Sequence, residues 1–270
     1  MRFGVSPLPS APAPELVRRW RELDSLEAFD VIWLPDQLAP RPGLRWLEAW
    51  TLLGALARET SRARIGPLVS PLTLRNPAVL ARAAITLDEL SGGRAELGVG
   101  AGGVELDDEL AGTRGGRGLR RFVARIDGVW ADARLEPSGT VPLTIGGMSE
   151  SILRLAAERA NRWSSYGGVD ADPAEAATLA TAHNRRLDEL CAEVGRDPRS
   201  LTRSILLGYL WVRETPWRSE DAFLEVVERW RGAGMDEIVF VHPPQAAMPD
   251  GAVAEGVFGH VARAVMPSLA

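Results

Sequence analysis

Two glycine-rich stretches are the clearest candidates for contact with a ligand. Gly98–Gly103 carries four glycines in six residues, and glycine lets a backbone approach a ligand closely. A ligand-facing loop and a plain tight turn explain it equally well, because the G-x-G-x-x-G spacing is missing. In the second stretch, Gly146 and Gly147 precede an expected helix, whose unpaired N–H groups favour an anion. Ser149 is also a good N-cap residue, but we favour a phosphate site here.

Polar side chains follow two of the short apolar segments. Asp36 comes directly after Pro35 and could accept hydrogen bonds from a ligand. An aspartate that simply forms a turn after a proline is a slightly better explanation. Ser70 and Thr73 could donate to polar atoms of a ligand. They fit equally well in a loop shaped by the neighbouring prolines, in which Arg75 caps a nearby carbonyl group.

Few side chains could serve as acid, base or nucleophile. His242 follows the last apolar segment and is the histidine best placed for catalysis, whereas His183 and His260 fall within expected helices. Cys191 also falls on a helix, where we expect a small buried hydrophobic side chain. The spacing supports neither a Ser-His-Asp order nor a pair of catalytic carboxylates.

The composition excludes several kinds of chemistry. All 31 basic residues are arginine, which rules out a Schiff-base lysine and a P-loop lysine. The net charge of −5 argues against a nucleic-acid partner. A single cysteine and three scattered histidines predict no disulfide framework and no metal site. With neither a long apolar run nor a signal peptide, we expect no membrane partner and a cytoplasmic protein.

Apolar runs alternate with amphipathic stretches eight times along the chain, which would place these residues at the ends of strands. The predicted strands are Arg2–Ser6, Val31–Leu34, Arg64–Ser70, Ala95–Val99, Pro142–Ile145, Arg162–Tyr166, Ser204–Val212 and Glu237–Val241. The predicted helices are Pro14–Glu27, Leu47–Glu59, Asn76–Leu90, Gly118–Trp130, Ser149–Ala160, Asp172–Val194, Ser219–Gly232 and Val253–Val265.

Eight strand–helix units predict an α/β fold, a single (β/α)₈ TIM barrel over residues 1–270. A doubly wound open sheet is the competing architecture, and it requires a glycine fingerprint after the first strand. The chain instead has Ser6-Pro7-Leu8-Pro9 at that point, so we prefer the barrel. Ligand chemistry in such a barrel lies at the carboxyl ends of the strands.

Several stretches, in order, resemble the bacterial-luciferase-like oxidoreductases that depend on flavin or deazaflavin. Each motif is weak alone, but together they cover nearly the whole chain. The stretches are Phe29–Asp36, Thr60–Val69, Arg75–Ala81, Thr86–Arg94, Leu97–Gly102, Pro142–Gly147, Leu155–Trp163, Gly195–Pro198 and Gly234–Ile238.

The resemblance implies hydride transfer to, or monooxygenation of, a small organic substrate by reduced deazaflavin coenzyme F420 or FMN. We favour the deazaflavin, because Asp36 and Gly195–Pro198 resemble those members. The family also implies a homodimer and a non-proline cis peptide backing the ring, expected here at Pro67-Leu68. The other residues that it implies for cofactor contact are Ser70 at the ring's polar edge, Ala101 and Gly102 through their backbone, and Gly146, Gly147 and Ser149 at the phosphate.

Departures from the family pattern keep other hypotheses open. Gln37 stands where many deazaflavin members have a histidine, and Gly103 stands where a sugar-phosphate dehydrogenase subtype has a glutamate. The segment between the fourth and fifth strands is shortened, which would open the pocket or leave its closure to a partner subunit. The weak catalytic candidates are therefore Asp36, Gln37 and His242. A non-catalytic flavin-binding or accessory relative is the main alternative, and unrelated hydrolytic or lyase chemistry is a third.

Overall fold

The apolar segments form short parallel strands, as expected for strands that are buried on both faces. The computed structural model describes residues 1–39, 42–113, 118–132, 141–208, 211–244 and 253–269. The strands are β1 (Arg2–Pro7), β2 (Val31–Leu34), β3 (Arg64–Pro67), β4 (Ser70–Pro71), β5 (Leu97–Gly100), β6 (Leu143–Gly146), β7 (Arg162–Ser165), β8 (Thr202–Leu207) and β9 (Glu237–His242). Their order in the sheet is β3-β2-β1-β9-β8-β7-β6-β5-β4.

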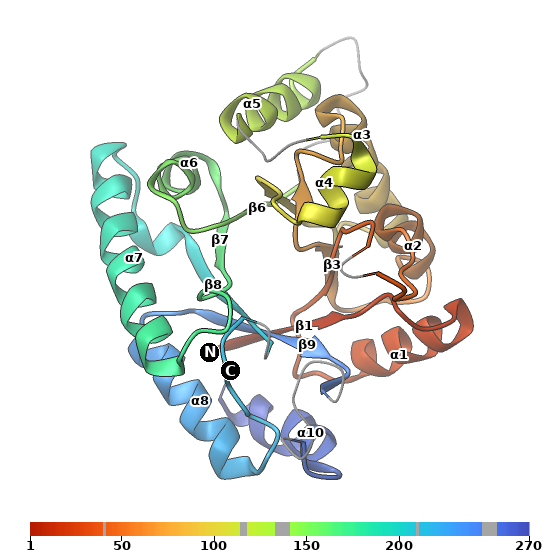
Figure 1. Ribbon diagram of the computed structural model, residues 1–270, viewed down its shortest axis with the longest axis vertical. Helices are drawn as coiled ribbons and strands as arrows, with labels where there is room; N and C mark the ends of the chain where they lie inside the picture. Colours follow the sequence, from red (N-terminus) through yellow and green to blue (C-terminus); the bar gives the residue numbers. More distant parts are fainter. Residues whose placement is uncertain (40–41, 114–117, 133–140, 209–210, 245–252, 270) are drawn as a thin grey trace.

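The sheet curls into a barrel because β3 and β4 are two parts of one predicted strand, Arg64–Ser70. β4 pairs with β5, and Ile65 of β3 forms a parallel bridge with Ala95, just before β5. The same strand therefore lies at both ends of the strand order and closes the ring (Figure 1). This confirms the predicted (β/α)₈ barrel. The non-proline cis peptide joins Leu68 to Val69, so the expectation of Pro67-Leu68 was wrong by one bond.

Helices cover the outside of the barrel (Figure 1). They are α1 (Ala13–Ser25), α2 (Ala49–Leu56), α3 (Pro77–Ser91), α4 (Glu105–Ala111), α5 (Leu119–Trp130), α6 (Glu150–Arg159), α7 (Pro173–Glu193), α8 (Glu220–Gly232) and α10 (Val257–His260). The predicted cap of α3 is confirmed, because the Asn76 side chain accepts from the backbone N–H of Ala78 at 2.9 Å. In the part of the chain that the structure describes, no helix is long and apolar enough to cross a membrane.

Two predicted elements differ clearly in their bounds. The strand predicted to reach Val212 ends at Leu207, because the chain turns there and Trp211 N–H donates to the Gly208 carbonyl at 2.8 Å. Residues 209–210 of that predicted strand lie outside the described residues. The last helix was predicted over Val253–Val265. In the structure it consists of α10, which has four residues, and a π-helical turn over Val261–Val265.

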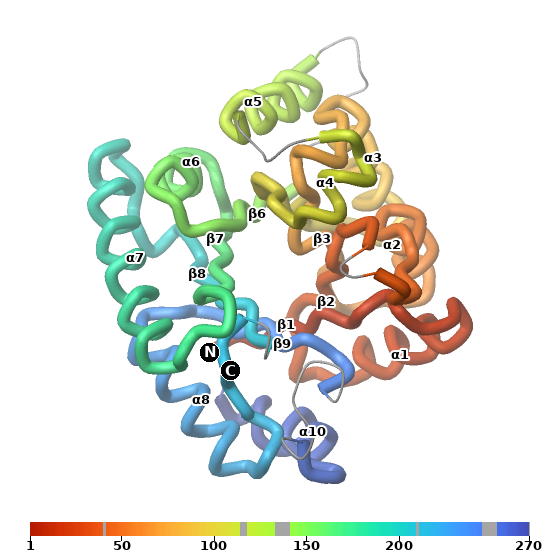
Figure 2. The backbone as a smooth tube through the Cα atoms, viewed as in Figure 1, coloured from red at the N-terminus to blue at the C-terminus, as the bar shows by residue number. Residues whose placement is uncertain are grey.

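The segment between β5 and β6 contains α4 and α5, and α4 was not predicted. This helix has only seven residues, four of them acidic, so it offers little apolar periodicity to detect. Residues 114–117 and 133–140 of the segment lie outside the described residues, so its relative shortness stays a prediction. α5 packs on α3, at the edge of the barrel farthest from both chain termini (Figure 2).

Side chains fill the inside of the barrel, which leaves the carboxyl ends of the strands for a ligand. At the amino ends, Arg162 bridges the carboxylates of Glu96 and Glu237, all three nearly fully buried. The Arg162 guanidinium lies 5.3 Å from the ring centroid of Trp33. An apolar layer of Val31, Trp33, Leu68 and Val239 packs inside the barrel.

Candidate functional site

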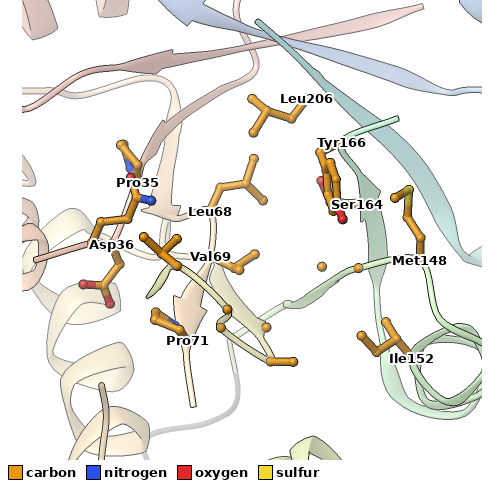
Figure 3. A pocket seen from close by; sticks show the side chains of 18 of the residues that line it. Pro35, Asp36, Leu68, Val69, Pro71, Met148, Ile152, Ser164, Tyr166 and Leu206 are labelled. Carbon is orange, nitrogen blue, oxygen red and sulfur yellow. The ribbon is translucent and has the colours of Figure 1, made fainter. Parts of the chain in front are cut away.

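A cavity of about 520 Å³ lies at the carboxyl ends of the strands, where the barrel fold places ligand chemistry. Loops and strand ends from β2 round to β8 contribute to its wall (Figure 3). The predicted residues that line it are Asp36, Gln37, Leu68, Thr73, Gly100, Ala101, Gly102, Gly103, Gly146, Gly147 and Ser149. Three other predicted residues, Pro67, Ser70 and His242, are not among the lining residues that the structure describes.

Val69 and two glycines build an apolar face of this cavity. A Cβ atom on Gly100 would lie 2.5 Å from Cγ2 of Val69, and one on Gly146 would lie 2.9 Å from its Cγ1. The Val69 side chain therefore occupies space that only glycines leave free. Leu68 and Leu206 line the cavity beside it (Figure 3). The result is an apolar surface directly after β3 that could contact one face of a flat ring.

Asp36 is held in the cavity wall by a polar network. Its carboxylate is 2% exposed and accepts from Ser70 Oγ at 2.6 Å and from Arg75 Nε at 2.9 Å. Ser70 Oγ also accepts from Trp50 Nε1 at 2.9 Å. The Ser70 hydroxyl is thus engaged on both sides and fully buried. Asp36 is a fixed carboxylate acceptor, and a role as a mobile acid or base is not favoured.

Arg75 binds carboxylates, so the alternative in which it caps a carbonyl group was wrong. Its guanidinium bridges Asp36 and Glu48, with 2.6 Å from Arg75 NH2 to Glu48 Oε1. Burial raises the pKa of Glu48, but hydrogen bonds from Thr51, Arg75 and Trp50 outweigh burial and lower it to about 2. Because Glu48 also accepts from the first N–H groups of α2, this helix is tied to the cavity wall.

The start of α6 offers N–H groups to an anion. Ser149 takes the N-cap position, but its hydroxyl makes no capping bond and lies 3.2 Å from Ser151 Oγ. Among the described residues, no acceptor is found for the backbone N–H groups of Glu150 and Ser151. Gly147 N–H, by contrast, donates to the Ser164 carbonyl at 3.0 Å. An anion here would therefore meet the first turn of α6, with Gly147 shaping the loop.

His242 is placed away from the cavity, against the C-terminal helix. Its ring lies 5.2 Å from that of Phe258, and its Nδ1 is buried without a hydrogen-bond partner in the described structure. Burial, followed by the charge of Arg19, lowers the pKa of His242 to about 4. In the described structure His242 therefore does not line the cavity. His260 lies on the surface, with Nε2 2.8 Å from Glu220 Oε2.

Sequence reasoning missed two aromatic residues and an aspartate of the cavity wall. Tyr166 follows β7 and its ring centroid lies 5.4 Å from that of Trp211, which follows β8. Asp107 of α4 accepts from the backbone N–H of Leu38 and Ala39 at 2.9 and 2.8 Å. The position of Tyr166 at the end of a predicted strand was the one usable signal.

Most residues that line the cavity are apolar, and a few are carboxylates. Asp36, Asp107 and Asp108 carry the formal charges, and the described lining residues include no arginine and no histidine. No group of three or more potential metal ligands occurs among the described residues. The residues present fit a flat apolar ring against Leu68 and Val69, with an anionic group at the α6 N-terminus. They do not resemble a metal centre.

Comparison with known proteins agrees with this architecture. A family model for luciferase-like monooxygenases matches residues 1–256. A 5,10-methylenetetrahydromethanopterin reductase from Methanolobus tindarius is 25% identical over 280 residues, covering 96% of this chain and 81% of that protein.

Two solved structures share the fold over the whole chain. An F420-dependent secondary alcohol dehydrogenase, solved with an F420-acetone adduct, has a TM-score of 0.78 at 15% identity, and the match covers 100% of this chain and 99% of that chain. A monooxygenase from Streptomyces bottropensis has a TM-score of 0.73 at 15% identity and is matched over 100% of both chains.

Proposed function

The chain belongs to the luciferase-like monooxygenase family, and from this premise we propose that it is an oxidoreductase that acts on a small organic substrate. Its cofactor in this proposal is reduced coenzyme F420, with FMN as the second choice and no metal. The observation that carries the proposal is the glycine-cradled apolar surface of Val69, which faces the same cavity as the free N-terminus of α6.

Three parts of the site would hold such a cofactor. Leu68 and Val69 would back the ring, since Gly100 and Gly146 leave room for the Val69 side chain. The N–H groups of Glu150 and Ser151 would bind the phosphate, because helix N-termini carry unsatisfied donors and a positive dipole end. Backbone atoms of Ala101 and Gly102 line the same cavity. When bound, the reduced cofactor supplies the hydride or activates oxygen.

The chain's own residues would orient the reactants and exclude water. The Trp50–Ser70–Asp36–Arg75 network fixes the wall beside the ring position. Gln37 lines the cavity but its neutral amide cannot exchange protons usefully. A proton needed by the reaction must therefore come from another group.

The preference for the deazaflavin rests on similarity. The reductase from Methanolobus tindarius matches most of this chain, and the F420-dependent alcohol dehydrogenase has the higher of the two TM-scores given above. The identities are low, so the substrates of these proteins are not transferred to this chain.

A non-catalytic, cofactor-binding relative is the second candidate. Gln37 and Gly103 line the cavity at the two positions where the family resemblance led us to look for a catalytic side chain. Tight binding of the cofactor without redox turnover across a substrate panel would favour this candidate.

Titration of the purified protein with reduced coenzyme F420 and reduced FMN tests both candidates. We expect micromolar or tighter binding of the deazaflavin and weaker binding of FMN. Binding of neither would contradict the proposed function. The proposal also includes a cytoplasmic homodimer with no nucleic-acid or membrane partner, and light scattering of the purified protein would test the dimer.

A further inference from the structure

The loops after β7 and β8 form one wall of the cavity, and this wall contains the phenol of Tyr166. We infer that Tyr166 is a catalytic residue that donates a hydrogen bond, and then a proton, to the oxygen of an uncharged carbonyl substrate. This inference rests on the proposed function and names its substrate class.

The carboxylates and the amide that line the cavity do not serve as the donor, and the aliphatic hydroxyls of Thr73, Ser149, Ser164 and Ser165 are too weakly acidic to give up a proton. Asp36 and Asp107 accept hydrogen bonds from an arginine, a serine and backbone N–H groups, so they act as carboxylate acceptors. Asp108 is also an acceptor, for the Thr113 hydroxyl at 3.4 Å. Gln37 cannot give up a proton, and His242 lies outside the lining. Tyrosine is a recognised general acid.

The position of Tyr166 is fixed by two loops that are joined to each other. Ala171 and Val212 form a parallel bridge outside the main sheet. Ala171 N–H donates to the Trp211 carbonyl at 2.8 Å, and Arg213 N–H donates to the Ala171 carbonyl at 3.0 Å. These bonds hold Tyr166 and Trp211 together, with their rings inclined by 58°. A preorganised donor of this kind loses little entropy when it binds a substrate.

The loops can approach this closely because of a glycine. Gly167 follows Tyr166 with a φ of +72°, and a Cβ atom there would lie 2.5 Å from Cγ2 of Val212. Gly167 N–H also donates to Ser165 Oγ at 3.1 Å. The turn that aims Tyr166 is therefore built from its own neighbours and does not depend on a ligand.

Tyr166 faces the apolar surface from the side opposite Asp36. Figure 3 shows Pro35 and Asp36 on one side, Tyr166 and Ser164 on the other, and Leu68 between them. A substrate lying over Leu68 and Val69 would meet the phenol with one edge. The described lining residues include carboxylates but no arginine, which disfavours a substrate that places a negative charge away from the α6 N-terminus.

The proposed step balances as a reduction. A C–H bond of the reduced deazaflavin would break and its hydride would form the new C–H bond at the carbonyl carbon, while the π pair of the C=O bond moves to oxygen. The Tyr166 O–H bond would break and its proton would form the alcohol O–H bond. The phenolate would regain a proton from water, and the oxidised cofactor would release its ring N–H proton to water, so that no net charge is left over. The carbonyl compound is reduced, the deazaflavin is oxidised, and the reverse sequence oxidises the alcohol.

The test compares the wild-type protein with Tyr166→Phe, which keeps the ring against Trp211 and removes the hydroxyl. Thr86→Val, which removes an exposed hydroxyl on α3, is the matched control. Each protein is loaded with reduced deazaflavin and mixed with cyclohexanone, cyclohexenone and benzaldehyde, and cofactor oxidation is followed in H₂O and D₂O.

We expect the wild type and Thr86→Val to oxidise the cofactor with at least one probe. Tyr166→Phe should lower that rate by about 10²-fold or more and lose the solvent isotope effect, because general acid catalysis contributes about 10²–10⁴-fold. Its affinity for the cofactor should stay unchanged. If all three proteins behave alike, or if none of the probes reacts with the cofactor-loaded wild type, the inference is wrong. Failure of the wild type to bind either cofactor would contradict the proposed function itself.

Discussion

At the scale of single residues, the site contains a carboxylate that is paired with an arginine and a phenol that has no partner charge in the described contacts. Asp36 is buried and its charge is matched by Arg75, which also holds Glu48. Such a group sets the electrostatic potential of the wall. Tyr166 has no such partner charge in the contacts that the structure describes. The contacts of Asp36 and Tyr166 therefore indicate different roles, Asp36 as a fixed charge and Tyr166 as a proton donor.

His242 should leave a pH signature in stability. Its pKa is lowered from 6.5 to about 4, so below pH 6.5 the unfolded chain binds a proton that the folded chain does not. Its contribution to stability is complete above about pH 6.5 and is lost as the pH falls to about 4, amounting to about 3 kcal/mol. Denaturant unfolding of the wild type and His242→Gln between these pH values measures the difference.

The same measurement on His260→Gln is the control, because His260 is exposed. We expect this substitution to change the free energy of unfolding by less than about 1 kcal/mol, because exposed ion pairs contribute little. A His242→Gln profile that parallels the wild type would show that His242 is not kept neutral by burial.

At the scale of elements, the N-terminus of α6 can be tested without disturbing the fold. Gly147→Asp is a poor probe, because Gly147 has a φ of +131°, a backbone conformation that residues with a side chain rarely adopt. Ser149 is exposed and occupies the N-cap, a position that accepts Asp and Asn equally well. Ser149→Asp adds a negative charge where the phosphate is proposed, and Ser149→Asn adds the same shape without charge.

We expect Ser149→Asp to weaken cofactor binding by about tenfold or more, since two like charges a few ångströms apart near a protein surface repel by more than about 1 kcal/mol. Ser149→Asn should bind within about threefold of the wild type, well under 1 kcal/mol. Fluorescence titration in low salt provides the comparison. Equal cofactor affinities of the two variants would show that the phosphate does not bind at the N-terminus of this helix.

The turn after β7 allows a second test at this scale, with two glycines of nearly equal φ. Gly167 has a φ of +72° and would clash with Val212, whereas Gly195 has a φ of +70° and nothing within 4 Å of its added Cβ. Gly195→Ala should cost about 1 kcal/mol from backbone strain alone. Gly167→Ala should cost a further 1–3 kcal/mol or so, because the loops must move apart.

Urea unfolding measures both variants, and a shift in the near-ultraviolet circular dichroism of Tyr166 and Trp211 should accompany Gly167→Ala alone. Equal costs for the two glycines would mean that the two loops separate freely. The preorganisation argued for Tyr166 would then lose its support.

At the scale of the whole molecule, a buried arginine links strands across the barrel. Arg162 of β7 joins Glu96, just before β5, to Glu237 of β9. Burial raises the pKa of Glu237, and the Arg162 charge opposes that rise. Arg162→Met would leave two buried carboxylates without this cation and should cost about 3–5 kcal/mol in the free energy of unfolding.

Arg186→Met is the matched control, because Arg186 makes ion pairs with Glu150, Glu189 and Glu193 on the surface. Exposed pairs contribute little, so we expect a loss below about 1 kcal/mol. Chemical denaturation at neutral pH compares the two. Similar losses would show that the Arg162 cluster is not shielded from water.

Much of the architecture could be predicted because it depends on local patterns. The eight apolar runs fixed the barrel, and Asn76 with Pro77 marked the start of α3. The strand over Ser204–Val212 was predicted too long because Trp211 and Val212 are apolar for another reason, namely that they line or support the cavity wall. In a sequence, apolar residues that are buried in a loop cannot be distinguished from apolar residues that are buried in a strand.

The sequence alone determined the fold class, the face of the barrel that carries the site, and the glycines that shape it. These features follow from periodicity and from the missing side chain of glycine, which lets the chain pack closely or adopt a positive φ. The tertiary structure decided which polar groups are available. It engaged Ser70 and Asp36 in one network, moved His242 out of the cavity, and brought Tyr166 beside Trp211. Those outcomes depend on contacts between residues far apart in the chain, whose distances and hydrogen bonds exist only after the barrel has closed.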